Sequence, residues 1–154
     1  MGNILTVQTY GYGGSSNAPG GTNAAGSTIV AGGFDPIVGL YAGGINQGGA
    51  LLGSNDDGVC GPGSGATDAG ICFDASLFFN SLGAGTYTVV LSVFPNFPPA
   101  NESAQFPGGG SFGDRTNAYA IDVVTSSTIP EPMTSMLVGT GLLALGYFAR
   151  RRRA

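Results

Sequence analysis

Short segments in which large apolar side chains alternate with smaller ones restrict most of this chain to β-structure. Over residues 86–94, Tyr87, Val89, Leu91 and Val93 alternate with smaller residues, which places the large side chains on one face of a strand. Residues 5–124 contain no dozen-residue window with the sustained 3.6-residue apolar period of a helix. Similar segments between Gly, Pro, Asn or Asp residues predict further strands at 5–12, 27–31, 36–41, 50–54, 75–79 and 118–123.

Seven short strands separated by loops are typical of a β-sandwich, and we predict an all-β, jelly-roll-like sandwich over residues 1–128. The length of 154 residues allows one domain with a short appendage. The chain contains 29 glycines, and only 9% of its residues are charged, against about 25% in typical soluble proteins. We therefore do not expect a typical cytosolic enzyme.

The charges exclude several function classes. Residues 1–128 carry eight acidic side chains and the single base Arg115, a net charge of −7, which argues against binding to nucleic acid. The chain has no histidine and no lysine, so Ser-His-Asp, Cys-His and Schiff-base chemistry are excluded. We predict that the protein is not an enzyme.

The end of the chain has three consecutive parts with different chemistry. Residues 133–149 contain no charged side chain, and as a helix they would extend about 25 Å at ~1.5 Å per residue, barely enough for a membrane. The prolines before this segment disfavour helix at the junction. By the positive-inside rule, the arginines after it would stay cytoplasmic and orient the body outward. The flanking residues are Pro130, Glu131 and Pro132 on one side and Arg150, Arg151, Arg152 and Arg153 on the other.

This arrangement over residues 129–154 resembles the PEP-CTERM sorting signal of Gram-negative bacteria. The resemblance implies an exported protein that is anchored in the cytoplasmic membrane by a transmembrane helix as a precursor. A membrane-bound exosortase would then recognise and remove the tail, releasing the body to the cell surface or the extracellular matrix. The alternatives are a plain tail anchor, which needs no Pro-Glu-Pro, and a buried helix, which would not end in four arginines.

The body resembles bacterial secreted sandwiches similar to pre-peptidase C-terminal domains. The resemblance rests on Ala-Gly-Gly-Phe-Asp-Pro at 31–36, Asn-Asp-Asp-Gly at 55–58, Ala-Gly-Thr-Tyr-Thr-Val-Val-Leu at 84–91 and Ala-Tyr-Ala-Ile-Asp-Val at 118–123. That family generally has another strand where this chain has only four residues before its first predicted strand. Residues 1–6 also lack the features of a secretory leader. We therefore expect that the leader and the true start lie upstream.

Two cysteines, Cys60 and Cys72, enclose a glycine-rich loop. Zinc would need four ligands, which this chain cannot supply from two cysteines and no histidine. In an exported protein the pair predicts a disulfide, and two free thiols are the alternative.

The segment Asn55, Asp56, Asp57 and Gly58 has two interpretations. These residue types suit a tight turn after the strand that ends at residue 54. The alternative is that they supply hard oxygen ligands for Ca²⁺. The candidate ligands for calcium are Asp35, Asp56, Asp57 and Asp74.

Two function classes remain. The first is a structural or interaction protein of the exopolysaccharide matrix or biofilm, displayed at the surface after exosortase processing. The second is a carbohydrate- or protein-binding module, calcium-dependent in one version, that stays tail-anchored in the membrane. Aromatic side chains that could serve such a module are Tyr10, Tyr12, Tyr41, Phe97 and Phe106.

Overall fold

The computed structural model describes residues 2–13, 21–57 and 72–127. This part of the chain contains eight strands and no helix, which confirms the all-β prediction. The strands are β1 (Asn3–Tyr10), β2 (Gly21–Thr22), β3 (Thr28–Ile29), β4 (Pro36–Ala42), β5 (Leu51–Asn55), β6 (Ser76–Leu82), β7 (Tyr87–Val93) and β8 (Ala120–Ser127).

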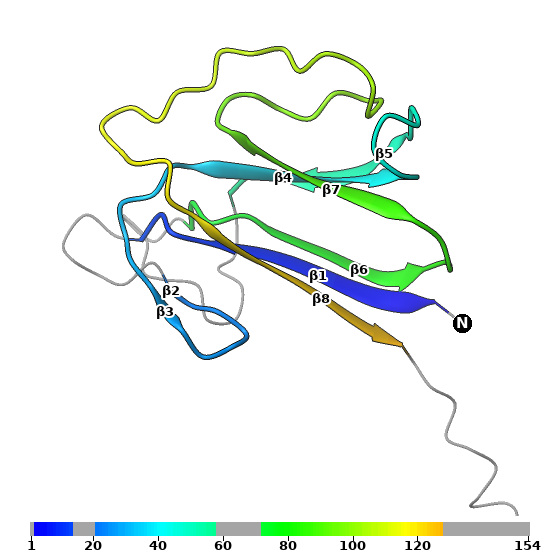
Figure 1. Ribbon diagram of the computed structural model, residues 1–154, viewed down its shortest axis with the longest axis horizontal. Helices are drawn as coiled ribbons and strands as arrows, with labels where there is room; N and C mark the ends of the chain where they lie inside the picture. The colour runs from blue at the N-terminus through cyan, green and yellow to red at the C-terminus, as the bar shows by residue number, and fades with distance from the viewer. Residues whose placement is uncertain (1, 14–20, 58–71, 128–154) are drawn as a thin grey trace, which may run out of the picture.

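The strands form three antiparallel sheets, two of which make up the body (Figure 1). One sheet has the order β6-β1-β8 and the other has the order β5-β4-β7, so β1 and β4 are the central strands. The third sheet is the short β2-β3 hairpin. Strand β1 pairs with β8 through Val7 and Val123, and β4 pairs with β7 through Leu40 and Val89.

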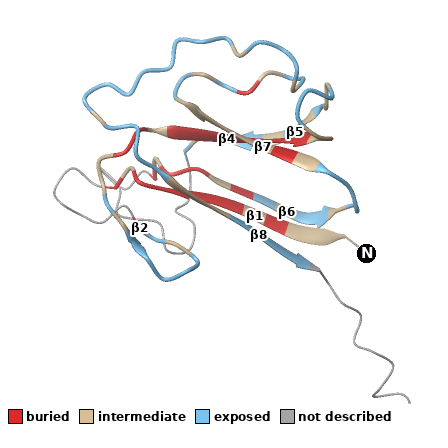
Figure 2. Ribbon diagram, in the orientation of Figure 1, coloured by how far each residue is buried: buried red, intermediate tan, exposed pale blue. Residues whose placement is uncertain are grey.

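The two three-stranded sheets face each other across one apolar core. Because side chains alternate along a strand, every second residue of a strand faces the partner sheet. Figure 2 shows the buried residues concentrated on the central strands β1 and β4. Burying each large apolar side chain contributes about 1.5–3 kcal/mol. The buried cluster consists of Leu5, Val7, Val38, Leu40, Ala75 and Leu77.

The outer face of β4 is also covered, by the loop that follows β7. Pro98 packs against Gly39, where an added Cβ would lie 2.9 Å from the Pro98 Cγ. The Tyr41 hydroxyl donates a hydrogen bond to the Pro99 carbonyl at 2.7 Å, and the Leu51 amide donates to the Ala100 carbonyl at 2.9 Å. A strand covered on both faces has no solvent-exposed face, which explains why β4 is apolar throughout and does not alternate apolar with polar residues.

Each of the seven predicted strands corresponds to a strand of the structure. The predicted strand 27–31 is reduced to Thr28–Ile29, while 118–123 moves towards the C-terminus as Ala120–Ser127. Strand β2 was not predicted, because two residues carry no measurable periodicity. Strand β8 lies at a sheet edge, so its Val123 remains half-exposed although its neighbour Ile121 packs on the core.

Across residues 2–13, 21–57 and 72–127, no helix is long and apolar enough to cross a membrane. The predicted transmembrane helix at 133–149 lies outside the described residues.

Candidate functional site

Three acidic side chains meet where β4 begins and β5 ends. Asp35, Asp56 and Asp57 each place a carboxylate oxygen within 4.8 Å of the others. Asp35 directly precedes β4, and the two neighbouring aspartates directly follow β5. Because β4 and β5 are antiparallel neighbours, with Val38 opposite Asn55, the start of one strand lies beside the end of the other.

The side chain of Asn55 shapes the bend that carries the two neighbouring aspartates. Its amide nitrogen donates to the Asp57 carbonyl at 3.3 Å, and its oxygen accepts a hydrogen bond from the Ser76 amide at 2.7 Å. In an extended strand, Asp56 and Asp57 would point to opposite faces. The chain bends here instead, and both carboxylates reach Asp35. Gly58, the other residue expected to shape this turn, lies outside the described residues.

Few interactions offset the burial and the mutual repulsion of these three carboxylates. Burial, together with the nearby charges of Asp57 and Asp56, raises the pKa of Asp35 to about 7, against a weaker opposing effect of Arg115. Burial and the charge of Asp57 raise the pKa of Asp56 to about 6, and burial also raises the pKa of Asp57. The Oδ1 atoms of Asp35 and Asp56 are buried and have no hydrogen-bond partner among the described residues. A buried oxygen without a partner is costly, so these two atoms are candidates to coordinate a bound ligand.

Asp74 lies outside this cluster of three. Its side chain is only 3% exposed and accepts a hydrogen bond from the Tyr12 amide at 3.3 Å. Burial raises the pKa of Asp74 to about 6, while hydrogen bonds from the Tyr12 and Gly11 amides and the charge of Arg115 act in the opposite direction. The fourth predicted ligand therefore joins the end of β1 to the start of β6.

Arg115 connects several segments at the same end of the molecule. Its guanidinium lies 3.4 Å from the ring centroid of Tyr12 and donates hydrogen bonds to the Gly33 and Tyr12 carbonyls. The ring of Tyr12 stacks in turn on Phe73, with centroids 4.5 Å apart. These contacts join the segments next to β1, β4, β6 and β8, and they fix the backbone that leads into Asp35.

The chemistry of the three carboxylates suits a hard cation. Ca²⁺ takes six to eight oxygen ligands in flexible geometry, including carboxylates, carbonyls and water. Asp35 and Asp56 are half-buried and Asp57 is exposed, so water can complete the coordination shell. The sequence predicted these three residues and Asp74 as candidate ligands, and the structure brings the carboxylates of the three together.

The other predicted site residues are only partly covered by the structure. Cys72 is buried and forms a disulfide. Its expected partner Cys60 lies outside the described residues, and so does the whole sorting motif at 130–132 and 150–153. The pairing and the motif therefore stay predictions.

The five aromatic candidates have different surroundings. Tyr10 and Tyr41 are buried, and Tyr12 lies between Phe73 and Arg115, so packing accounts for all three. Phe97 is exposed and makes an edge contact with Phe94. Tyr10 lines a cavity beside the β2-β3 hairpin, and Phe106 lines one beside β7.

The cavity at Phe106 is an open aromatic pocket of about 460 Å³ between β7 and the loop that leads to β8. Phe34 makes edge contacts there with Phe112, at 5.3 Å between centroids, and with Tyr119, at 5.9 Å. Sequence reasoning missed these three rings, because no spacing in the chain indicates that residues 34, 112 and 119 meet. The pocket is completed by Leu91, Ser92, Val93, Asn96 and Phe106.

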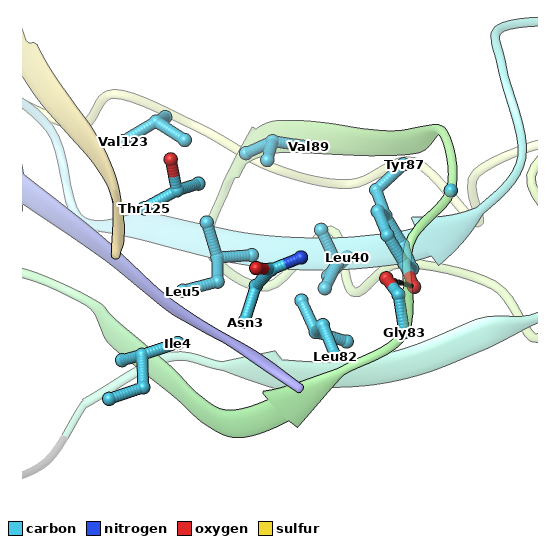
Figure 3. A pocket seen from close by; sticks show the side chains of 11 residues that line it. Asn3, Ile4, Leu5, Leu40, Leu82, Gly83, Tyr87, Val89, Val123 and Thr125 are labelled. Carbon is cyan, nitrogen blue, oxygen red and sulfur yellow. Dashed lines mark hydrogen bonds between the residues drawn. The ribbon is translucent and has the colours of Figure 1, made fainter. Parts of the chain in front are cut away.

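Another cavity of about 450 Å³ opens between the sheets, among residues from the start of β1, the end of β6 and the start of β7 (Figure 3). Leu5, Leu40 and Leu82 converge in it, and the Tyr87 hydroxyl closes one side by donating to the Gly83 carbonyl at 2.8 Å. No charged side chain lines this cavity in the described part of the chain. It is an open end of the core, and we do not assign it a chemical role.

Comparison with protein-family models, with curated proteins and with solved structures gives no match to this chain.

Proposed function

We propose that this chain is an exported β-sandwich protein of the cell surface or extracellular matrix of a Gram-negative bacterium. Its body is a jelly-roll-like sandwich that binds calcium through Asp35, Asp56 and Asp57. Its tail, residues 129–154, is a PEP-CTERM signal whose transmembrane helix holds the precursor in the cytoplasmic membrane until an exosortase processes it. The mature body then acts as a structural or interaction component of an exopolysaccharide matrix.

The observation that carries the proposal for the body is the convergence of the three carboxylates. Mutual repulsion and burial oppose their simultaneous ionisation, as the raised pKa of Asp35, about 7, indicates. A divalent cation removes both penalties, because it neutralises the charges and coordinates the two orphaned oxygens. Extracellular modules bind Ca²⁺ with dissociation constants of about 10⁻⁴–10⁻³ M, an affinity that a half-exposed set of three carboxylates can reach.

Two further observations support export. Cys72 forms a disulfide, and disulfides persist in oxidising compartments and are rare in the cytosol. Pro-Glu-Pro, an uncharged segment and four arginines follow one another in the order that a PEP-CTERM signal requires. Each of these observations is independent of the calcium site.

The sorting step is tested by immunoblot in a bacterium that carries an exosortase, with the chain placed behind a secretion leader. The unmodified chain is expected to shift from a membrane-bound precursor to a smaller released form. Deleting Arg150 to Arg153 removes the topology information, and replacing Glu131 and its flanking prolines removes the recognition element. Both variants should accumulate as precursor, whereas normal processing of both would reduce the tail to a plain membrane anchor.

A further inference from the structure

The aromatic pocket is an additional feature of the body. Its rings come from distant segments: Phe34 precedes β4, while Phe106, Phe112 and Tyr119 belong to the long loop between β7 and β8. Phe112 and Tyr119 remain 45% and 54% exposed although they contact the buried Phe34. Exposed aromatic side chains that cluster around a cavity mark an interaction site more often than isolated ones do.

We propose that this pocket binds a pyranose ring of a neutral polysaccharide. The inference rests on the proposed function, since it identifies the place where the body contacts the matrix. A sugar ring has an apolar C–H face that can lie on an aromatic ring and an edge of hydroxyl groups that must stay hydrogen-bonded. The ligand should therefore be amphipathic, and three features of the pocket favour that chemistry.

The first feature is the open shape of the pocket. Its volume of about 460 Å³ falls within the ~300–1,000 Å³ typical of small-ligand sites. Its two outer rings, Phe112 and Tyr119, are about half-exposed in the free protein. A ligand resting on them keeps one face in water, which suits a hydroxylated ring and does not suit an acyl chain, whose burial requires enclosure.

The second feature is the pair of polar groups at the rim. The Asn96 side-chain oxygen accepts a hydrogen bond from the Gly108 amide at 2.8 Å, which fixes the orientation of the side chain. Within the described residues, the Asn96 side-chain nitrogen and the Tyr119 hydroxyl make no hydrogen bond. Both groups can therefore donate to sugar hydroxyls while the rings contact the apolar face.

The third feature is charge. None of the described residues that line the pocket is charged. Residues 1–128 carry eight acidic side chains against one arginine, so the field around the body repels polyanions. A neutral polysaccharide is therefore favoured over an acidic one, and over a phosphate-bearing lipid surface.

The test is affinity electrophoresis of the full chain, purified oxidised in a mild non-ionic detergent. Native gels contain dextran, hydroxyethylcellulose or galactomannan as neutral probes and alginate as the acidic probe. We expect retardation in at least one neutral gel and none in alginate. Phe112→Ala combined with Tyr119→Ala should weaken binding about tenfold or more, because anchoring aromatics dominate such sites. Tyr119→Phe keeps the ring and should lose only part of the affinity.

Phe78→Ala is the matched control, because Phe78 is an exposed phenyl ring on β6 that does not line the pocket. It should bind like the unmodified chain. Unchanged melting temperatures would show that the double variant is folded, as expected for two exposed rings. The inference is overturned by absence of retardation in all three neutral gels, by equal retardation of the double variant, or by binding to alginate alone.

Two other occupants of the pocket have their own readouts. Enhanced fluorescence of an apolar dye, lost in the double variant and without any retardation by polysaccharide, would assign an apolar ligand and overturn the inference. Pocket-dependent dimerisation in sedimentation velocity, again without retardation, would assign a second copy and overturn it too. Neither result affects exosortase processing, so failure here is distinguishable from failure of the proposed function.

Discussion

Asp35, just before β4, and Asp56, just after β5, meet at the open end of the β4-β5 hairpin, and in the described part of the chain each has a buried carboxylate oxygen without a hydrogen-bond partner. Their arrangement is a direct consequence of strand pairing, because the antiparallel register brings the residue before β4 next to the residue after β5. The free protein is therefore destabilised locally when these groups ionise, and a cation would relieve that destabilisation.

The stability of the metal-free protein should fall as the pH rises. The pKa of Asp35 is raised from 3.8 to about 7 and that of Asp56 from 3.8 to about 6. Between pH ~4 and ~7 the folded state therefore binds more protons than the unfolded chain. The stabilisation is thus complete below pH ~4 and is lost as the pH rises through about 6 to 7. Denaturant unfolding in chelator at pH 5 and pH 7.5 measures this, and Asp35→Asn should flatten the difference. A free energy of unfolding that is higher at pH 7.5 than at pH 5 would contradict the raised pKa values.

The disulfide prediction concerns Cys72 and its expected partner Cys60. Oxidised protein should show no free thiol in a denaturing Ellman assay and two thiols after reduction, because the chain has only these two cysteines. Closing a loop of about 13 residues contributes roughly 3 kcal/mol in the chain-entropy description, so reduction should lower the melting temperature. Two reactive thiols in material exported to the periplasm would refute the pairing.

Gly39 tests the covering of β4 by the loop after β7. An added Cβ would lie 2.9 Å from the Pro98 Cγ and 3.0 Å from the Val90 Cγ2, so Gly39→Ala must displace one of them. We expect a loss of about 1–3 kcal/mol in the free energy of unfolding, as for other overpacked sites. Gly83→Ala is the control, because the nearest atom to its Cβ would be the Tyr87 hydroxyl oxygen at 3.9 Å. Equal stability of the two variants would mean that the loop does not hold Pro98 against the strand.

The local part of this fold was predictable from the sequence, and the long-range part was not. Alternation identified the strands, and it placed Tyr87, Val89 and Leu91 correctly on the core side of β7. The covering of Gly39 by Pro98 was not predictable, because an irregular loop carries no periodicity that reveals what it packs against.

At the candidate site too, local features were predictable from the sequence and long-range contacts were not. Asp56 and Asp57 stood out as neighbours in a turn sequence, and Asp35 and Asp74 were the further candidate ligands. The prediction could not separate Asp74 from them, because only the fold reveals that the Tyr12 amide engages its carboxylate. The aromatic pocket was missed for a similar reason, since Phe34 and Tyr119 meet only through the packing of the β7-β8 loop.

Calcium binding by the three carboxylates is the central claim, and thermal unfolding of the full chain at pH 7.5 in chelator and in millimolar calcium tests it most directly. Calcium should raise the melting temperature, with a gain of about 0.4–1.4 kcal/mol at one to ten times the dissociation constant, the range that 1 mM calcium covers. Asp56→Ala or Asp57→Ala should abolish the rise, whereas Asp114→Ala, an exposed carboxylate on another loop, should preserve it. An identical melting temperature of the unmodified chain in chelator and in calcium would contradict the account and leave Asn55 to Gly58 as a turn.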